Sequence, residues 1–344
     1  MLTQTVAGRV YDYSHAVGGR HILRPIATAV GAGDVVYTLE RPNENISNVP
    51  WNKTATGARV SVCTIGTVAG DEQFERDFSK YGDDEGELIW PAGIAIDSQE
   101  NVYVTDEWLN RVTVFDKDGS SQSVWGVAGG DDGQLNRPSG IATDLEDNLL
   151  VVDSLNHRVQ RFTRDGAFLG GWGSVGTGQG ELNSPWGIDV DDEGFVYVAD
   201  HKNHRVQKFS ADGEYVAEFG SYGAGRGQLN RPSDVAVDPD GDVYVCDWAN
   251  SRVQIFAPDG KFITSLVGDA QHLGKWHQEQ VDANVDVIKA RRRAYSLEPE
   301  WRFALPSGVT FDRERQRLLV ADTQRARLQI YSKLSDYLEP QFNL

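Results

Sequence analysis

The sequence of 344 residues is poor in cysteine, lacks any long apolar run and holds fewer basic than acidic side chains. Its two cysteines, Cys63 and Cys246, fall in strand-like segments of different repeats, and neither belongs to a Cys-x-x-Cys pair. We therefore expect no disulfide between them and no cysteine zinc site, which fits a reducing compartment. No run of about 18 apolar residues occurs, so a transmembrane helix is not expected.

The first residues, MLTQTVAGRVYDYSH, show no basic segment followed by an apolar one, which is the pattern of a secretory signal. We therefore expect a cytoplasmic location for the chain as given. A protein whose leader had been trimmed would show the same features, so this expectation concerns only the sequence in hand.

Basic side chains are outnumbered: 33 Lys and Arg stand against 51 Asp and Glu, which gives a formal net charge of −18. Phosphate backbones are bound mainly by Lys and Arg that release counterions, and an acidic surface repels them. Anionic membrane surfaces are disfavoured for the same reason. The composition predicts no nucleic-acid and no membrane partner, and leaves a small-molecule ligand or a protein partner.

What the sequence does contain is glycine, with 36 residues, and an internal repeat. Copies of the repeat start at Pro91, Pro138, Pro185 and Pro232, at a constant step of 47 residues. Their sequences are PAGIAIDSQENVYVTDEWLNRVTVFDKDG, PSGIATDLEDNLLVVDSLNHRVQRFTRDG, PWGIDVDDEGFVYVADHKNHRVQKFSADG and PSDVAVDPDGDVYVCDWANSRVQIFAPDG. A fifth copy starts at Pro306, and a degraded sixth starts at Pro25 and resumes at Ala58. Such a period indicates a repeat architecture in which each copy is one structural unit.

Each copy predicts a four-stranded antiparallel sheet. In the first full copy, three short β-rich runs cover residues 93–97, 102–105 and 111–115, separated by Asp, Asn and Gly. A fourth run ends in a large apolar residue, which we expect to pack between neighbouring sheets. These residues are Phe78, Trp125, Trp172, Phe219 and Leu266. Six such sheets predict an all-β, six-bladed β-propeller that forms a single domain over residues 1–344.

The last copy lacks a fourth strand, whereas the N-terminal segment GRVYDYSHAVGG has the pattern of a fourth strand with no sheet before it. We therefore predict that the N-terminus completes the sixth blade. Closure of the ring in this way removes the exposed edge of an open array.

The repeated pattern GIAVD, VYVAD and NHRVQ resembles the NHL-repeat family, whose members are propellers. The resemblance covers most of the chain. It implies the fold, but the family includes enzymes, RNA binders and interaction scaffolds, so the fold alone does not imply one function.

Two insertions interrupt the repeats, at about residues 41–57 and 269–305. In a propeller the loops from the fourth strand to the next first strand emerge on the same face as the loops from the second to the third strand. Both insertions are therefore expected on one face, where they would touch each other and roof the channel, burying Trp51, Trp276 and Trp301. Val281, Val285 and Ile288 have the spacing of one helical face, so we predict a helix across the channel mouth. Arginines 291–293 follow it, either as solvated helix-end charges or as a site for an anionic group.

An aspartate precedes an arginine by five residues in each of five copies, which predicts a structural ion pair in every one. The pairs run from Asp106, Asp153, Asp200, Asp247 and Asp322 to Arg111, Arg158, Arg205, Arg252 and Arg327. The residues beside them differ between copies and are the better site candidates. These are Glu107, Trp108, Ser154, His201, Lys202, Trp248 and Thr323.

The NHL resemblance also suggests a comparison with peptidyl-hydroxyglycine amidating lyases and with calcium lactonase and organophosphatase propellers, which place metal ligands near the start of each first strand. The matching positions here are Ile26, Ala92, Ser139, Trp186, Ser233 and Ser307, and none of them is His, Asp, Asn or Glu. Asp234 lies one residue further on and is expected to point elsewhere, because side chains alternate along a strand. We therefore predict no metal site and no cofactor, while weak calcium binding to carbonyls and Asp side chains stays compatible with the sequence.

Two functions fit these features. One is a small-molecule enzyme, a hydrolase or a lyase, with its site at the lidded channel mouth. Its candidate catalytic residues are Glu107, His201 and Arg41, and its candidate binding residues are Trp51, Trp108, Trp186, Trp248, Trp301 and Arg302. The other is a non-catalytic propeller that binds a protein or a carbohydrate on the same face. A deep pocket would favour the enzyme, and a broad flat face would favour the partner.

Overall fold

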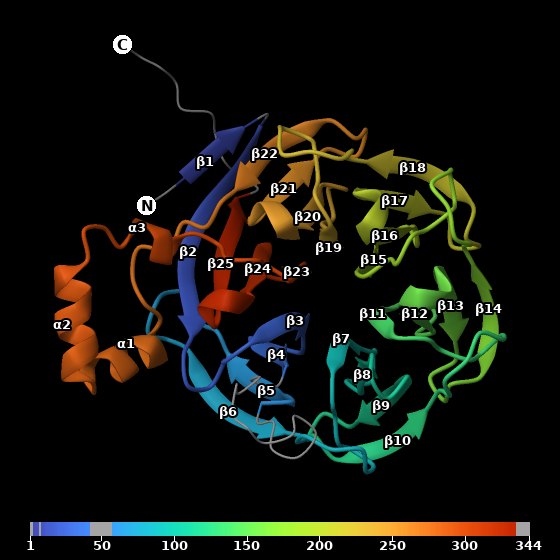
Figure 1. The fold of residues 1–344 in the computed structure, drawn as a ribbon, viewed down its shortest axis with the longest axis horizontal. Helices are drawn as coiled ribbons and strands as arrows, with labels where there is room; N and C mark the ends of the chain where they lie inside the picture. The colour runs from blue at the N-terminus through green and yellow to red at the C-terminus, as the bar shows by residue number, and fades with distance from the viewer. Residues whose placement is uncertain (1–2, 7, 42–56, 335–344) are drawn as a thin grey trace.

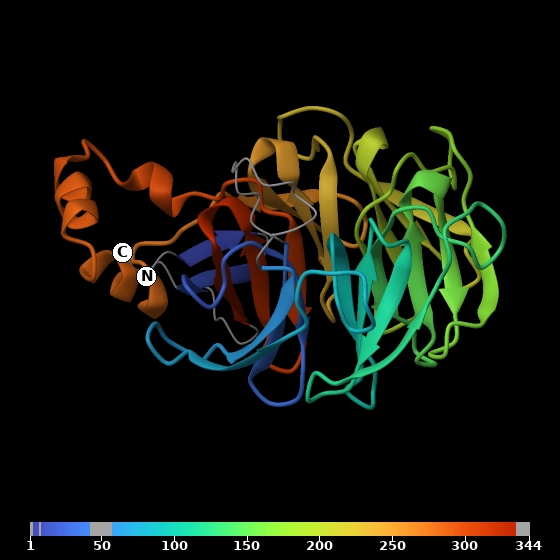
Figure 2. The ribbon, with the colours of Figure 1, turned by 60° about the horizontal axis from the view of Figure 1, so that its bottom comes forward.

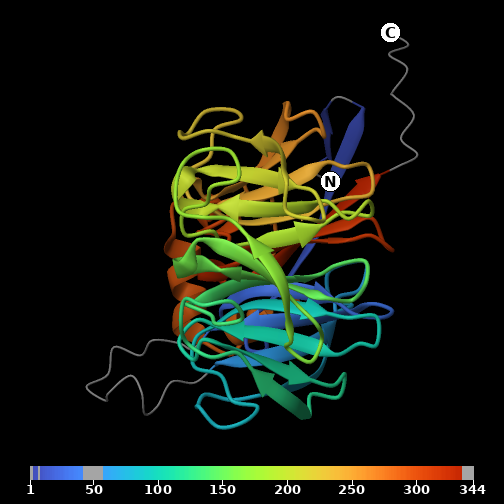
Figure 3. The same cartoon turned by 90° about the vertical axis from the view of Figure 1, so that its right-hand side faces the viewer.

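The computed structural model describes residues 3–6, 8–41 and 57–334, and it forms six antiparallel sheets arranged as a ring around a central axis (Figure 1). The predicted six-bladed β-propeller is confirmed. Figure 3 shows the ring from its side, with blades three and four towards the viewer. Within each blade the first strand lies at the channel and the fourth at the outer rim.

The strands follow the repeats in order. Blade one contains β3 (Pro25–Val30), β4 (Val35–Glu40), β5 (Arg59–Thr64) and β6 (Gln73–Phe78). Blade two contains β7 (Pro91–Ile96), β8 (Val102–Asp106), β9 (Arg111–Phe115) and β10 (Ser121–Trp125). Blade three contains β11 (Pro138–Thr143), β12 (Leu149–Asp153), β13 (Arg158–Phe162) and β14 (Phe168–Trp172). Blade four contains β15 (Ile188–Val190), β16 (Val196–Asp200), β17 (Arg205–Phe209) and β18 (Tyr215–Phe219).

Blade five contains β19 (Pro232–Val237), β20 (Val243–Asp247), β21 (Arg252–Phe256) and β22 (Phe262–Leu266). Blade six contains β23 (Gly308–Asp312), β24 (Arg317–Asp322), β25 (Arg327–Leu334), β2 (Arg9–Gly18) and β1 (Thr3–Val6). Short 3-10 turns link the second and third strands of blades three to six, and these are η1 (Ser154–Asn156), η2 (His201–Asn203), η3 (Trp248–Asn250) and η4 (Thr323–Arg325).

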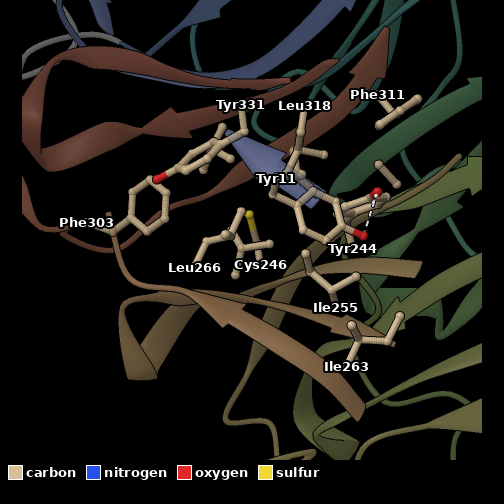
Figure 4. Packing of buried hydrophobic residues seen from close by; sticks show 14 residues of the cluster. Tyr11, Tyr244, Cys246, Ile255, Ile263, Leu266, Phe303, Phe311, Leu318 and Tyr331 are labelled. Atoms are coloured by element: carbon tan, nitrogen blue, oxygen red, sulfur yellow. Dashed lines mark hydrogen bonds between the residues drawn. The ribbon is translucent and has the colours of Figure 1, made fainter. Parts of the chain in front are cut away.

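The N-terminal segment closes the ring, as the sequence predicts. Strand β2 pairs antiparallel with β25, so the fourth strand of blade six comes from the opposite end of the chain. Strand β1 folds back on β2 and adds a fifth strand at the rim, which the repeat pattern did not indicate. Behind the closure, Tyr11 of β2 packs edge-on against Tyr244 of blade five in a buried cluster that includes Cys246 (Figure 4). Both cysteines are buried and free, which confirms that they form no disulfide.

The large residues that end the outer strands pack between neighbouring blades, as predicted. Trp172 of blade three contacts Phe209 of blade four, with ring centroids 6.0 Å apart. The same indole lies against Gly213, where a Cβ atom would sit 2.6 Å from the ring, at a φ of +85°. Glycine is therefore required there both for the turn and for the close approach of the tryptophan.

The repeated aspartates form the predicted ion pairs in four of the five copies, with distances of 2.7–3.1 Å between the arginine Nε and the carboxylate. Blade two differs. There Asp106 accepts the backbone N–H groups of Ile89 and Trp90, while Arg111 donates to three backbone carbonyls. Both arrangements hold the loop before the first strand against its own blade, so the role is structural.

The second insertion does not roof the channel, and this prediction is wrong. Its helices α1 (Lys275–Asp282), α2 (Val285–Arg293) and α3 (Glu298–Trp301) lie outside the ring beside β2 (Figures 1 and 2). The loop leaves β22 at the outer rim, and Trp276 anchors it there by packing with Val17 and Ile22. Gly19 permits this approach, since a Cβ atom on it would lie 2.6 Å from the backbone of α1.

The single helix predicted across Val281, Val285 and Ile288 is also wrong. The chain breaks after Asp282, and the side chain of Asn284 caps a new helix by accepting the backbone N–H groups of Asp286 and Val287. Val285 is 62% exposed, so the apolar face does not pack on the ring. Of the first insertion, predicted at about residues 41–57, residues 42–56 lie outside the described residues.

Candidate functional site

A cavity of about 450 Å³ lies in the central channel. The first strands of all six blades line it. The positions singled out near the strand starts all face it, namely Ile26, Ala92, Ser139, Trp186, Ser233 and Ser307. Arg41 and Glu107 line the end of the channel where the fourth-to-first and second-to-third strand loops emerge, and we call this end the mouth.

The three channel serines are held by bonds between blades. The Oγ of Ser139 donates to the carbonyl of Trp186 at 2.9 Å, and the Oγ of Ser307 donates to the carbonyl of Ile26 at 3.0 Å. Ser233 donates in the same way to Pro306 at 3.2 Å. These hydroxyls therefore serve the packing of neighbouring blades.

Asp234 faces the channel, which corrects the expectation that it points elsewhere. The register of β19 shifts between Pro232 and Asp234, so simple alternation does not hold at this point. Its carboxylate lies against Gly187 of blade four, where a Cβ atom would sit 2.2 Å from Oδ1. Its Oδ2 accepts the backbone N–H of Val309 in blade six at 2.9 Å.

Asp189 is a second channel carboxylate, which the sequence reasoning missed. Its Oδ2 accepts the backbone N–H of Val237 at 2.8 Å. A signal for it existed: the equivalent position is Ala29, Ala95, Ala142, Ala236 or Thr310 in the other blades. A carboxylate in place of alanine on the channel face breaks the repeat in the same way as the mouth residues that were singled out.

Burial sets the protonation of both carboxyl groups. Desolvation raises the pKa of Asp189 to about 6, with the positive charge of Arg313 acting in the opposite direction. Desolvation raises the pKa of Asp234 to about 8, and the charge of Asp189 adds to the effect. Near neutral pH, Asp189 is thus mainly ionised while Asp234 mainly keeps its proton.

Arg313 narrows the end of the channel opposite the mouth. Its side chain reaches from blade six to the backbone carbonyl of Val190 in blade four at 2.7 Å, and it pairs with Asp192 at 2.9 Å. The guanidinium also donates to the carbonyl of Val237 in blade five at 3.4 Å, so it is held by blades four and five. It supplies a positive field to Asp189 with no direct hydrogen bond seen between the two side chains.

At the mouth, the residues that differ between copies bind the next blade. Arg41 donates from Nε to the carbonyl of Pro91 at 2.9 Å and pairs with Glu107. Thr323 donates to the carbonyl of Pro25 at 2.7 Å. The structure thus brings the predicted Arg41 and Glu107 together on the channel wall, where both line the cavity.

His201 makes the equivalent bond in blade four, with Nδ1 3.1 Å from the carbonyl of Pro232. A carbonyl only accepts, so Nδ1 carries the proton and Nε2 is the free acceptor. The imidazole stacks on Trp186 at 3.9 Å between ring centroids, and Trp248 lies edge-on to the same indole at 6.2 Å. Burial lowers the pKa of His201 to about 4, so the ring is neutral at physiological pH. His201 positions the tryptophan rather than lining the channel itself.

The family model for the NHL repeat matches residues 88–115, 135–162, 182–209 and 229–256. Each matched segment ends with the third strand of one blade, and the four segments fall in blades two to five. The complete ring has six blades. The chain is an NHL-repeat propeller.

Two solved structures similar to this NHL-repeat propeller are lyases. A streptogramin B lyase is 12% identical, with a TM-score of 0.56 over 94% of this chain and 98% of that chain. A catalytically inactive virginiamycin B lyase from Staphylococcus aureus, with quinupristin, is 13% identical, with a TM-score of 0.55 over 94% and 99%. At these identities the similarity shows a shared fold. Among curated proteins, none matches the sequence significantly.

The remaining predicted site residues that the structure describes in the NHL-repeat propeller lie away from the channel. Trp108 is 51% exposed on the mouth face. Trp301 and Arg302 belong to the helical insertion outside the ring, where Arg291 lies 5.8 Å above the indole and Arg302 pairs with Glu298. Trp51 lies outside the described residues.

Within residues 3–6, 8–41 and 57–334, no group of three or more His, Cys, Asp or Glu side chains is placed to hold a metal ion. No helix of these segments has the length and apolar character that crossing a membrane requires.

Proposed function

We propose that this NHL-repeat propeller processes a small molecule in its central channel by acid–base chemistry of the hydrolase or lyase type. The observation that carries the proposal is the pair of channel carboxyl groups, Asp189 and Asp234, which come from adjacent blades and differ in protonation. Two titratable groups whose environments separate their pKa values provide one base and one acid at the same pH. A channel of about 450 Å³ falls in the range of small-molecule sites.

The two groups have distinct roles in this proposal. Asp189, ionised near neutral pH, takes a proton from the substrate or from a water molecule. Asp234, still protonated, gives its proton to the leaving group. Neither carboxylate moves freely, because each is held by a backbone N–H of the next blade.

Both reaction types balance with these groups alone. In an elimination, Asp189 removes a proton from a substrate carbon, and the electron pair of that C–H bond forms the new double bond. The bond between the neighbouring carbon and the leaving oxygen breaks, and that oxygen takes the proton of Asp234. In a hydrolysis, Asp189 deprotonates a water whose oxygen attacks the substrate, and Asp234 again protonates the leaving group. Proton exchange with solvent then resets the pair. The fold is compatible with elimination, since two similar propellers are lyases.

The test is a screen of ester, lactone, phosphotriester and β-elimination substrates against the intact protein, with product analysis to separate hydrolysis from elimination. Asp189→Asn and Asp234→Asn should each lower kcat at least about 100-fold, as expected for a general acid or base. Asp212→Asn, at an exposed turn, is the matched control and should retain full activity. Activity that survives both channel substitutions would contradict the proposal.

A second function, partner binding without catalysis, is favoured by a different observation. The mouth face exposes several large apolar side chains, namely Trp108, Val127, Val175 and Tyr222, which are 51–68% exposed. A protein or carbohydrate partner would cover them. Substitution of Trp108 and Tyr222 by Ser should abolish such binding and leave channel chemistry unchanged.

A further inference from the structure

We infer that the ligand taken by the channel carries a positively charged group, a protonated amine or a similar small organic cation, which lies between Trp186 and the carboxyl groups of Asp189 and Asp234. This inference rests on the proposed function and names the substrate class of the same site.

Nearly every charged side chain on the channel wall has an opposite charge beside it. Arg41 pairs with Glu107, and Arg313 pairs with Asp192. At the far end, Asp312 pairs with Arg317 at 2.9 Å, and Glu314 pairs with Arg315 at 3.1 Å.

Asp189 and Asp234 are the exceptions. Each carboxylate accepts a hydrogen bond from a backbone N–H group. Among the described residues, neither carboxylate has a basic side chain within 4.0 Å. An ionised carboxylate that is removed from water without a counter-charge raises the free energy of the folded protein. A second carboxyl group close by adds repulsion whenever both are ionised. A cation from outside would relieve both costs at once, whereas an anion would add to them.

Trp186 supplies the second element of a cation site. It lines the channel directly before Gly187, against which the carboxylate of Asp234 lies. An indole face attracts cations within about 6 Å of its centroid. Its stacking partner, His201, donates to a backbone carbonyl and is neutral at physiological pH, so no fixed positive charge sits behind the ring to repel the ligand.

The two arginines of the channel oppose a cation only weakly at this position. Arg41 pairs with Glu107 at the mouth. The charge of Arg313 reaches Asp189, but its pair with Asp192 at the opposite end reduces the field that a ligand meets. The stretch between them holds the two carboxyl groups and apolar side chains such as Ile94, Ile141 and Val235. An apolar amine matches this mixture of an acidic centre and an apolar wall.

The test uses three probes of one shape and different charge: benzylammonium, benzyl alcohol and benzoate. Titration calorimetry on the full chain at pH 7 should show benzylammonium binding at least about tenfold more tightly than benzyl alcohol, with benzoate weakest. Asp189→Asn with Asp234→Asn should remove this preference, and Trp186→Leu should reduce it. Asp212→Asn makes the same charge change on an exposed turn and should preserve it.

Proton release gives an independent readout. Asp189 has a pKa of about 6, so at pH 6 part of the free protein carries a proton on it, and a bound cation should release that proton while Asp234 keeps its own. The binding enthalpy at pH 6 should therefore differ between phosphate and Bis-Tris buffers for the wild type and agree for Asp189→Asn.

Three outcomes would overturn the inference: equal binding of benzyl alcohol, tighter binding of benzoate, or no binding of any probe at millimolar concentration. These outcomes are separate from failure of the proposed function. An uncharged substrate whose turnover needs Asp189 and Asp234 would leave the acid–base proposal standing and reject only the cation.

Discussion

Lys333, at the end of the last strand, donates from Nζ to Oδ2 of Asp242 on the neighbouring blade at 3.0 Å. The same ammonium contacts Asp238, and Arg9 of β2 binds Asp242 through two nitrogens at 2.7 Å. Both carboxylates are buried, with 0–2% of their surface exposed. Arg9, near one end of the chain, and Lys333, near the other, thus both place a positive charge at the turn of blade five, beside the point where the ring closes.

Replacement of Lys333 by Met should therefore destabilise the whole ring. It leaves Asp238 and Asp242 buried with one cation fewer, and removal of one partner from a buried ionic cluster costs about 3–5 kcal/mol. Urea unfolding monitored by tryptophan fluorescence measures the loss. Lys261→Met is the control, because the pair between Lys261 and Asp259 is solvent-exposed and should not affect stability measurably. Equal stability of the two variants would contradict the role of the buried cluster.

Truncation before His15 should also destabilise the protein, because β2 would lose half of its pairing with β25, from Val10 to Tyr13. Two strand edges would then face water at the closure. Truncation before Gly8 is the matched control, since it removes only the outer strand β1 and keeps β2 in place. We expect a much lower melting temperature for the longer deletion than for the shorter one. Similar melting curves for both proteins would refute closure by β2.

The stability of the ring should fall in mild acid through His201. Its folded pKa of about 4 lies below the unfolded value of 6.5, so the unfolded chain binds the proton more readily. The neutral imidazole therefore contributes fully above pH 6.5, and this contribution is lost as the pH falls towards 4, by on the order of 3 kcal/mol. His201→Gln keeps a donor for the carbonyl of Pro232 but does not titrate. Urea midpoints at pH 7 and pH 4.5 should differ less for this variant than for the wild type.

Asp234→Asn should stabilise the protein at neutral pH while it impairs function. The folded pKa of about 8 lies above the unfolded one, so this carboxyl group favours folding in acid. That contribution is lost as the pH rises from about 4 to 8, and at pH 7 the side chain opposes folding. An asparagine accepts the N–H of Val309 without this cost, and we expect a gain of about 2 kcal/mol. The gain in the urea midpoint should vanish near pH 4; a gain that does not depend on pH would have another cause.

Gly187→Ala should displace the carboxylate of Asp234. The added Cβ would lie 2.2 Å from Oδ1 and 2.5 Å from the Cα of Asp234, so backbone as well as side chain must move. We expect a loss of about 1–3 kcal/mol, typical of overpacking, and a lower preference for benzylammonium. Gly170→Ala is the control, since a Cβ there meets nothing within 4 Å. Unchanged cation preference in Gly187→Ala would place the carboxylate elsewhere.

The ring and its closure follow from the sequence because they depend on local patterns. The step of 47 residues, the alternation within short runs and the surplus N-terminal strand each report pairing between neighbours in a sheet. The mouth residues Arg41, Glu107 and His201 were found for the same reason, since a break in an otherwise regular repeat is visible along the chain.

The contents of the channel were decided by the tertiary structure. Asp234 faces the axis because β19 shifts its register and because Gly187, on another blade, leaves room for the carboxylate. Asp189 and Asp234 influence each other across a blade boundary, and the pKa of each depends on how much water the closed ring excludes. The helical insertion lies outside because Trp276 packs on β2, more than 250 residues away in the chain. Sequence patterns report contacts between residues at fixed short spacing, whereas desolvation and packing between distant segments exist only once the ring has closed.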